Sequence, residues 1–403
     1  MKLEDVNLLE DAWVEGVPHE AFDLLRREAP VFRHPEPEGG PGFWAITKHA
    51  DVYSISRDHQ TFSSELGGTF IEDQTDEALA QLRLTILNMD PPKHERYRKL
   101  VSKAFRRRGV GGLVESIEAH AAEVVDEIVD RGECEFTEDV ASRLPVDTIC
   151  EMVGVPREDW SEMYRLSNKL VGFDDPDFQT SPEDGQAAAF EIYQYCDKIA
   201  AERRVQPRED LLTALVEAEV DGERMTDLEI NLFFVTLIVA GTETTRNLIS
   251  HSMLAMIDYP GEAQRLRDEP SLWPTAVEEM LRWGTSIHNF RRTATRDTEV
   301  RGVPISANDK LVLYYMSANR DEEVFQDPHR FDVGRQPNDH VTFGGGGAHF
   351  CLGAHLARAE IGAIMRQLVT RLDTVELVAP VNRLRSDFIN GIKEMRLRFR
   401  PAA

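Results

Sequence analysis

The 403-residue sequence lacks the features of several large protein classes. It carries 71 acidic against 46 basic residues, a formal net charge of −25, so the surface as a whole would repel nucleic acid and anionic membranes. Acidic side chains interrupt the opening residues, where a secretory leader would have a basic start and an apolar stretch. We therefore expect a cytoplasmic protein, in the simplest case a monomer, that binds neither nucleic acid nor membrane.

Cysteine is scarce, and its spacing excludes the common cysteine-based sites. The four cysteines are Cys134, Cys150, Cys196 and Cys351, and they form neither a CxxC zinc or redox pair nor a disulfide framework. Free cysteines are usually small buried hydrophobes, and we expect three of the four to be so. Cys351 stands apart because a glycine-rich stretch precedes it and a helical pattern follows it.

Periodic apolar patterns predict the fold class, which is mainly α with small β-sheets (α+β). The absence of internal repeats and low-complexity linkers favours a single domain over residues 1–403. Strand-like runs are short and lie at residues 42–46, 310–315 and 394–398. The expected helices span residues 18–29, 93–107, 113–131, 144–153, 187–204, 210–218, 226–258, 274–283 and 354–371.

The most informative of these helices begins at Thr226 and ends before Pro260. Thr226 and Glu229 have the spacing of a capping box. No charge occurs from residue 230 to 242 and apolar residues occupy every face, so we expect the helix to be buried all round. The uncharged run is shorter than the roughly 20 residues of a membrane span. The sequence therefore predicts a helix that crosses the middle of the protein.

Within this helix, residues 240–245 read AGTETT, a small-residue step followed by a carboxylate and hydroxyls. Burial of a carboxylate such as Glu243 costs several kcal/mol unless it is hydrogen-bonded, and a helical glycine costs about 1 kcal/mol relative to alanine. Two interpretations remain open. The segment is either a functional groove or a structural kink whose hydroxyls bond back to the preceding turn.

A second motif is the loop FGGGGAHFCLG at residues 343–353, which places Cys351 at the start of the expected helix 354–371. Unpaired N–H groups and the helix dipole at such a position favour thiolate over thiol. Glycines also let the backbone approach a flat cofactor closely. The alternative is a flexible loop before a core cysteine, but helix, cysteine and His349 together favour the functional interpretation.

Two further motifs carry little weight alone. Glu279 and Arg282 stand at i and i+3, the spacing of a common surface ion pair that contributes about 0.2–0.5 kcal/mol. His94 and Arg98 form an i, i+4 pair. Each pair is also compatible with a solvated helix surface.

Taken in order, these motifs resemble those of the cytochrome P450 family over essentially the whole chain. They are HxxxR at 94–98, AGxETT at 240–245, ExxR at 279–282 and the glycine–cysteine loop at 343–353. The resemblance implies the cytochrome P450 fold, with haem b (iron protoporphyrin IX) between the long central helix and the cysteine-loop helix. It also implies a monooxygenase that inserts one atom of O2 into an apolar substrate.

The resemblance assigns roles to five residues of these motifs. Cys351 is expected to be the axial thiolate and metal ligand, which favours O–O cleavage. Glu243 and Thr244 are expected to form an acid–alcohol pair that relays protons to the distal oxygen. Glu279 and Arg282, with Arg330 as a third member, are expected to lock the cysteine side of the fold.

Larger sets follow from the same resemblance. Positions that pair with the haem propionates through charge-assisted hydrogen bonds are His94, Arg98, Arg292 and His349. The other expected cofactor-binding residues are Ala240, Gly241, Phe343, Gly344, Cys351 and Gly353. The substrate pocket is expected to be apolar and to include Val235, Val239, Ala240, Ile287 and Ile389.

One departure from the family pattern points to a subgroup. Phe343 lies eight positions before Cys351, whereas seven is the commonest spacing. The longer loop, with TTRN at 244–247 and NGIK at 390–393, is similar to that of actinobacterial enzymes that hydroxylate sterol side chains and methyl-branched lipids. We therefore expect that substrate class, with a linalool-type terpenoid hydroxylase as the alternative.

No fused flavin, iron–sulfur or nicotinamide-binding segment is visible, so electrons must come from a separate protein. The resemblance suggests a ferredoxin with an NAD(P)H-dependent ferredoxin reductase. Two rival functions are a peroxide-driven peroxygenase and a non-catalytic haem sensor, and the acid–alcohol pair argues against both. Residues that could form a basic patch for the redox partner, or could simply be solvated, are Lys103, Arg106, Arg107, Arg108 and Arg358.

Overall fold

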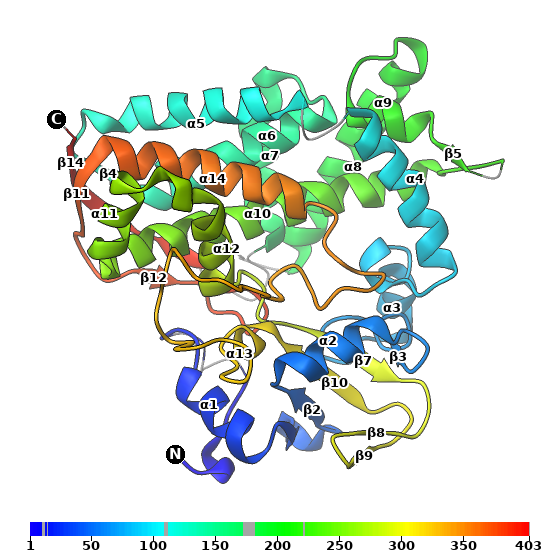
Figure 1. The fold of residues 1–403 in the computed structure, drawn as a ribbon. Helices are drawn as coiled ribbons and strands as arrows, with labels where there is room; N and C mark the ends of the chain where they lie inside the picture. The colour runs from blue at the N-terminus through cyan, green and yellow to red at the C-terminus, as the bar shows by residue number, and fades with distance from the viewer. Residues whose placement is uncertain (10–12, 14, 109–111, 172–181, 221, 403) are drawn as a thin grey trace.

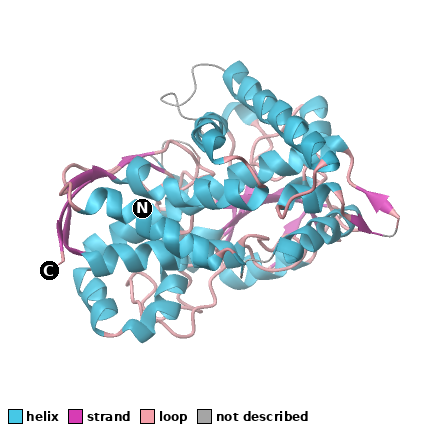
Figure 2. Cartoon of the chain, turned by 90° about the horizontal axis from the view of Figure 1, so that it is seen from above, coloured by secondary structure: helices cyan, strands magenta, loops and turns pink. Residues whose placement is uncertain are grey.

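The computed structural model describes the chain except residues 10–12, 14, 109–111, 172–181, 221 and 403. Helices make up most of the described residues (Figures 1 and 2). They are α1 (His19–Glu28), α2 (His49–Arg57), α3 (Asp76–Leu82), α4 (Lys93–Arg108), α5 (Val114–Val129), α6 (Arg143–Val153), α7 (Trp160–Val171), α8 (Pro182–Val205), α9 (Leu211–Val216), α10 (Asp227–Asp258), α11 (Pro260–Asp268), α12 (Trp273–Gly284), α13 (Tyr315–Ala318) and α14 (Ala354–Arg371).

The strands are short and form small sheets, as expected. They are β1 (Val31–His34), β2 (Phe43–Ile46), β3 (Phe62–Ser63), β4 (Glu133–Glu135), β5 (Glu219–Val220), β6 (Glu223–Arg224), β7 (Asn289–Ala294), β8 (Thr298–Val300), β9 (Val303–Ile305), β10 (Lys310–Tyr314), β11 (Leu372–Leu377), β12 (Asn382–Arg383), β13 (Ile392–Glu394) and β14 (Arg396–Pro401).

Every helix expected from the sequence is present, and the strands expected at 42–46 and 310–315 are β2 and β10. The strand expected at 394–398 corresponds mainly to β14, but it does not begin at residue 394, because the chain breaks at Met395 between β13 and β14. Met395 is fully buried, and its N–H donates to the Glu135 carboxylate at 2.6 Å while its carbonyl accepts from the N–H of Phe136 at 2.9 Å. These contacts with the β4 segment remove Met395 from the regular ladder.

Helix α10 runs through the middle of the molecule and contacts α6, α7, α8, α12 and α14 (Figure 1). The predicted capping box is confirmed, since the Thr226 hydroxyl accepts from the Glu229 N–H at 3.2 Å and the Glu229 carboxylate accepts from the Thr226 N–H at 2.8 Å. Among the described helices, α10 alone is long and apolar enough to cross a membrane. A central helix packed by five others meets the same criterion.

The expectation that α10 is buried on every face is wrong at its centre. Val235 and Val239 are only half-buried and Ala240 is exposed, although Phe233, Phe234 and Ile238 are buried. Protein side chains therefore leave part of the helix surface uncovered between residues 235 and 240. Such a partly covered apolar surface is what a helix that lines a ligand site requires.

A five-stranded sheet in the order β1-β2-β10-β7-β3 lies apart from the main helical layers (Figure 1). Strand β2 pairs antiparallel with β1 and parallel with β10, and β7 pairs antiparallel with both β10 and β3. Helix α1 packs on a buried cluster that includes Phe43, Val312 and Tyr314, whereas α2 packs on one that includes Ile46, Leu311 and Leu313. The alternation of strand side chains thus separates two apolar layers, one under each helix.

Candidate active site

The cysteine loop is closed by a main-chain hydrogen bond from Cys351 N to Phe343 O at 3.0 Å. Between these residues, Gly344, Gly346 and Gly347 have φ values of 91°, 87° and 74°. Residues other than glycine rarely adopt such positive φ values. The conformation of the loop, and with it the position of Cys351, therefore depends on the glycine run.

Helix α2 explains a further glycine of the loop. A Cβ at Gly345 would lie 2.8 Å from both the Val52 carbonyl and the Ser56 hydroxyl, and the Gly345 carbonyl accepts from Arg57 Nε at 3.3 Å. Packing against α2 thus requires glycine at this position. The longer loop noted in the sequence lies directly on α2.

The Cys351 side chain combines exposure with a position deep in the protein. Cys351 is the only solvent-exposed cysteine, whereas Cys134, Cys150 and Cys196 are buried, as expected. Desolvation raises the pKa of the Cys351 thiol, while the N–H of Gly353 and the charges of Arg98 and Arg358 act in the opposite direction. The net shift of the pKa is upward, so these three groups only partly offset the desolvation of the thiolate, the form that binds iron.

Four nitrogen-bearing side chains predicted to contact haem propionates come together. The rings of His94 and His349 are 4.3 Å apart, and both ring nitrogens of His94 are buried without a partner. Arg98 Nη2 donates to the Phe350 carbonyl at 2.7 Å, and the buried Arg292 donates Nη1–H to the Arg291 carbonyl at 2.8 Å. Within the described part of the chain, neither Arg98 nor Arg292 has a carboxylate partner.

The pKa shifts of this cluster indicate what it would bind. Burial, with repulsion from Arg98, lowers the pKa of His94 to about 4. Burial, then Arg292 and His94, lowers the pKa of His349 well below its usual value. A bound anion would reverse this repulsion and supply acceptors for the unpaired nitrogens. The two propionates of haem fit this arrangement, with the Cys351 sulfur available for the iron.

The predicted acid of the proton relay is held in a network along α10. Glu243 is 3% exposed, and its Oε1 accepts from Arg246 Nη2 at 2.7 Å and from Asn247 Nδ2 at 2.8 Å. Asn247 Oδ1 in turn accepts from the Ile392 N–H at 3.1 Å. Sequence reasoning missed Arg246 and Asn247 as partners of Glu243, although their i+3 and i+4 spacing from Glu243 could have identified them.

The structure does not bring the Glu243 and Thr244 side chains into contact with each other. Thr244 Oγ1 donates to the Ala240 carbonyl at 2.6 Å, one turn earlier. Successive side chains on an α-helix point about 100° apart. A direct hydrogen bond between the two predicted relay residues is therefore absent in this conformation of the described chain.

Gly241 has a packing role in addition to the contact with the cofactor that the sequence predicts. A Cβ at this position would lie 2.4 Å from Ile149 Cδ1 of α6. Gly241 is therefore required for the close approach of α6 to α10. Of the two small residues, Ala240 is the more exposed.

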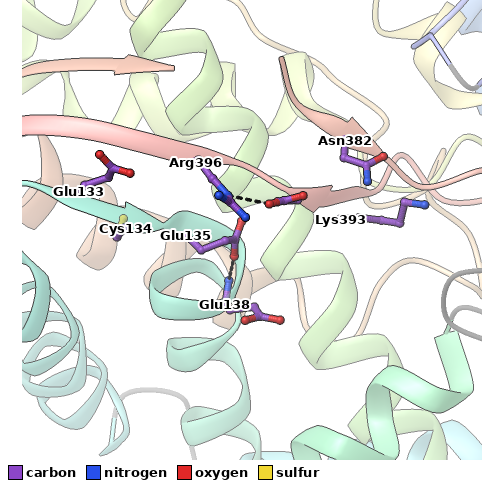
Figure 3. Close-up of a pocket in the computed structure, with 8 residues that line it drawn as sticks. Glu133, Cys134, Glu135, Glu138, Asn382, Lys393 and Arg396 are labelled. Carbon is purple, nitrogen blue, oxygen red and sulfur yellow. Dashed lines mark hydrogen bonds and ion pairs between the residues drawn. The ribbon is translucent and has the colours of Figure 1, made fainter. Parts of the chain in front are cut away.

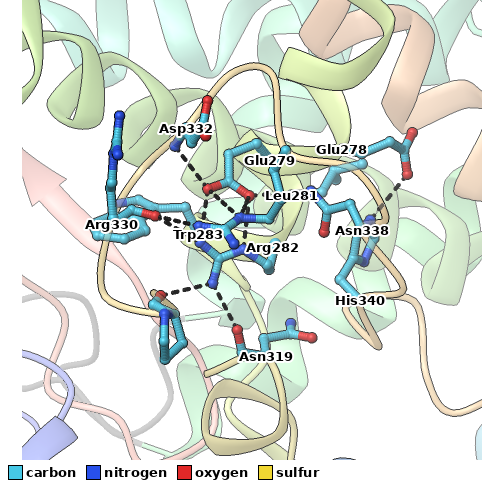
Figure 4. Close-up of polar contacts among 12 residues, drawn as sticks. Glu278, Glu279, Leu281, Arg282, Trp283, Asn319, Arg330, Asp332, Asn338 and His340 are labelled. Atoms are coloured by element: carbon cyan, nitrogen blue, oxygen red, sulfur yellow. Dashed lines mark hydrogen bonds and ion pairs between the residues drawn. The ribbon is translucent and has the colours of Figure 1, made fainter. Parts of the chain in front are cut away.

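Glu279 and Arg282 form a fully buried ion pair on α12 (Figure 4). Two parallel hydrogen bonds of 2.7 Å join the guanidinium to the carboxylate, and Arg282 Nη1 also donates to the Asn319 carbonyl at 2.8 Å. The third residue of the network is Arg335, whose Nε lies 3.1 Å from Glu279 Oε2, so the prediction that the Arg330 side chain takes this place was wrong. Arg330 contributes its main-chain carbonyl, which accepts from Arg282 Nη2 at 3.2 Å, and its side chain points away (Figure 4).

Three of the expected pocket residues meet in one apolar cluster. Val239, Ile287 and Phe388 pack around the buried Ile389, and Ile287 pairs with Ile389 through an isolated β-bridge. Val235 packs instead against the main helical core. The cluster joins α10 to two segments that are distant in sequence.

The predicted basic patch is only partly described. The side chains of Lys103, Arg106, Arg107 and Arg108 lie outside the described residues. Arg358 is not a free cation, because its Nε and Nη2 lie 2.6 and 2.8 Å from the Glu278 carboxylate and its guanidinium stacks on Phe343 at 4.6 Å.

A separate groove of about 680 Å³ lies along β4, β13 and β14 (Figure 3). Its lining includes Glu133, Glu135, Glu138 and Arg396. Arg396 Nε is 2.7 Å from Glu394, and the Glu138 N–H donates to Glu135 at 2.7 Å. The groove contains none of the residues predicted to bind haem or substrate.

Comparison with known proteins shows the family to which the chain belongs. The Cytochrome P450 family model matches residues 146–399. The chain is 38% identical to a steroid C26-monooxygenase of Rhodococcus jostii over 98% of this chain and 84% of that protein. It is 42% identical to a methyl-branched lipid omega-hydroxylase of Mycobacterium tuberculosis over 96% of this chain and 92% of that protein.

Solved structures agree with this relationship. A Mycobacterium marinum cytochrome P450 in complex with pseudoionone has a TM-score of 0.90 at 39% identity and covers 98% of both chains. A Bacillus megaterium enzyme in complex with testosterone has a TM-score of 0.83 at 30% identity, covering 95% of this chain and 99% of that chain. These similarities indicate the same fold and the same cofactor, haem. They also indicate that the protein requires O2, a lipophilic substrate and a redox partner. The chain belongs to the cytochrome P450 family of haem-dependent monooxygenases.

Proposed function

We propose that this cytochrome P450 hydroxylates the side chain of a sterol or a methyl-branched lipid. The observation that carries the proposal is the apolar cluster of Val239, Ile287, Phe388 and Ile389 beside the central helix. Such a lining suits a substrate that offers mainly hydrocarbon. The names of the Rhodococcus and Mycobacterium relatives support the same substrate class.

A terpenoid is the second candidate substrate. It is favoured by the similarity to the Mycobacterium marinum enzyme that was solved with pseudoionone. The two candidates differ in bulk and rigidity, so one binding experiment separates them.

Bound haem would supply an iron centre that activates O2. In the proposed site, the Cys351 sulfur would hold the iron, and the Gly353 N–H with the Arg98 charge would favour the thiolate. His94, Arg98, Arg292 and His349 would bind the propionates, and Phe343, Gly344 and Ala240 would contact the ring.

Proton delivery in this proposal depends on Glu243 and Thr244. Glu243 Oε1 is occupied by Arg246 and Asn247, whereas Oε2 has no hydrogen-bond partner among the described residues. Oε2 can therefore take up a proton and pass it on, directly or through water, while Oε1 keeps its partners. The Thr244 hydroxyl holds a proton at Oγ1 and would become available to donate it once its bond to the Ala240 carbonyl is released.

Electrons, in this proposal, come from a ferredoxin and an NAD(P)H-dependent ferredoxin reductase, and the protein acts as a cytoplasmic monomer with residues 1–403 as one domain. The proposal is tested by optical titration with cholest-4-en-3-one, a methyl-branched fatty acid and linalool, followed by product analysis with a surrogate ferredoxin system. Displacement of iron-bound water by the sterol or the branched acid is expected. Preference for linalool would favour the terpenoid function, and product formation with hydrogen peroxide alone would contradict the ferredoxin proposal.

A further inference from the structure

Residues 65–73 lie against β7 and β10, where two buried cations hold them. Arg291 on β7 and Lys310 on β10 each have side chains that are only 4% exposed. Arg291 Nη1 lies 2.8 Å from Asp73 Oδ1, and Lys310 Nζ lies 2.8 Å from Asp73 Oδ2. Both cations also donate to the Ile71 carbonyl, at 3.3 and 3.4 Å. We call Asp73, Arg291 and Lys310 the Asp73 clamp.

The main chain of residues 65–73 also contacts Arg291. The Arg291 N–H donates to the Thr69 carbonyl at 2.9 Å. Gly67 packs so tightly on the guanidinium that a Cβ would lie 2.2 Å from Arg291 Nη2. On its other side, Arg83 Nε donates to the Glu65 carbonyl at 2.8 Å. The segment is therefore fixed from two directions.

Charge makes Asp73 the critical member of the clamp. Lys310 has a second carboxylate, Glu36, at 2.7 Å, but Asp73 is the only carboxylate paired with Arg291 among the described residues. Loss of Asp73 would leave the largely buried Arg291 without a charged partner, although the exposure of Asp73 keeps the pair modest in strength. Desolvation acts to raise the pKa of Asp73, but hydrogen bonds from Lys310 and Arg291 outweigh it and the net shift is downward. Asp73 therefore stays ionised and paired.

The clamped segment carries Phe70, whose ring contributes to the apolar site. The ring centroids of Phe70 and Phe388 are 5.0 Å apart, and those of Phe388 and Phe290 are 5.3 Å apart. All three rings are half-buried, and Phe388 packs on Ile389 of the pocket cluster. Phe290 lies in strand β7 of the sheet, and Phe388 lies in a segment beside the sheet. Only Phe70 depends on the clamp for its position.

We propose that Asp73 is a positioning residue for substrate selectivity, because its ion pairs with Arg291 and Lys310 hold Phe70 against Phe388 and Phe290 as one aromatic wall of the pocket. A rigid, bulky apolar ligand gains contact area from a fixed wall, whereas a small ligand that reaches only the iron does not. The inference rests on the proposed function for the substrate that the wall contacts. Its test uses iron-binding azoles, which are independent of substrate class.

The test compares Asp73→Asn with Glu72→Gln, a neutralisation of the neighbouring exposed carboxylate that takes no part in the clamp. Optical titration of the haem protein with clotrimazole, a bulky triaryl azole, and with imidazole gives a ratio of two dissociation constants. We expect Asp73→Asn to weaken clotrimazole about three- to tenfold with imidazole unchanged, since a partly exposed ion pair is modest in strength. Glu72→Gln should leave both values at wild type. Equal ratios in the two variants would overturn the proposal.

Three further tests separate positioning from general destabilisation. Chymotrypsin cleavage after Phe70 should be faster in Asp73→Asn than in Glu72→Gln, at equal thermal stability. Salt at 1 M should move wild-type clotrimazole affinity toward that of Asp73→Asn and leave the variant unchanged, because Asp73 is exposed enough for its charge to be screened. Asp73→Glu keeps the charge and should restore most of the affinity. A glutamate variant as weak as the asparagine variant would contradict an ionic clamp.

The sterol arm keeps the two proposals distinct. Cholest-4-en-3-one should lose affinity in Asp73→Asn in parallel with clotrimazole. If the wild-type protein binds neither the sterol nor the branched acid, the proposed substrate class fails while the azole and cleavage results still decide the role of Asp73.

Discussion

Two buried carboxylates in this protein have the same local sequence pattern and different surroundings. Glu243 on α10 and Glu279 on α12 each precede an arginine by three residues, and each forms an ion pair with it, to Arg246 and Arg282. Glu279 accepts from Nε and Nη2 of Arg282 and from Arg335, the Asp332 N–H and Asn338. Glu243 accepts from two donors, both at one oxygen.

The difference shows that spacing defines a pair and the environment defines its role. A carboxylate that is saturated with donors cannot change partners without leaving several of them buried and unpaired. Glu279 is therefore a fixed point that connects α12 with the chain segment around residues 330–338. Glu243 retains an oxygen without a partner among the described residues, and this is the property that a proton carrier requires.

The largest expected effect follows from breaking the saturated pair. Removal of one partner of a buried ion pair costs about 3–5 kcal/mol, and total stabilities are about 5–15 kcal/mol. We expect Arg282→Ala to yield little folded haem protein, measured by thermal unfolding and by the red-shifted absorption band of the carbon monoxide complex. The matched control is Arg143→Ala, which removes an exposed pair with Glu127 at 3.1 Å and should unfold like wild type. Normal yield of the Arg282 variant would contradict the structural role.

Sequence reasoning identified the central helix and its capping box because both depend on local spacing. The structural role of the Glu279–Arg282 pair came instead from the resemblance to the family, because its spacing alone also fits a surface pair. Sequence reasoning failed where the path of a loop decides the contact. Arg335 rather than Arg330 reaches Glu279, since the turn after α13 brings residue 335 to the carboxylate and turns residue 330 outward. Periodicity also could not show that Ile149 requires Gly241, because that contact joins two helices far apart in sequence.

The second effect tests the unsaturated carboxylate. Glu243→Gln keeps the shape and an acceptor for Arg246, but it removes the group that takes up protons. A general acid contributes roughly 10²–10⁴-fold, so we expect turnover of the folded haem protein to fall about a hundredfold with a larger solvent isotope effect. Thermal stability should also fall, because the buried Arg246 loses its charged partner. The measurement is NADH-driven product formation in H2O and D2O. Wild-type turnover would exclude Glu243 from proton delivery.

A smaller effect is expected at Thr244, which shares the helix but not the network. Thr244→Ala should continue to consume reductant while product per NADH falls about tenfold and hydrogen peroxide is released, because the hydroxyl proton is missing at the site of oxygen reduction. Thr236→Ala is the control, since Thr236 Oγ1 donates to the Leu232 carbonyl at 2.7 Å in the same back-bonding geometry two turns earlier. If both variants couple equally well, the Thr244 hydroxyl has only a helical role.

The smallest expected effect comes from the guanidinium that restrains Glu243. Arg246→Lys retains a positive charge but replaces a planar fork with a point charge, so the carboxylate should keep one contact and lose orientation. We expect turnover to fall about fivefold, equivalent to ~1 kcal/mol for one hydrogen bond, with product per NADH unchanged because Thr244 is intact. The same substitution at Arg282 should destabilise the fold, since Arg282 also serves the Asn319 and Pro328 carbonyls at 2.8 and 3.0 Å. If Arg246→Lys instead lowers thermal stability as much as Arg282→Lys, the two pairs have the same structural role, and Glu243 is no freer than Glu279 to change partners.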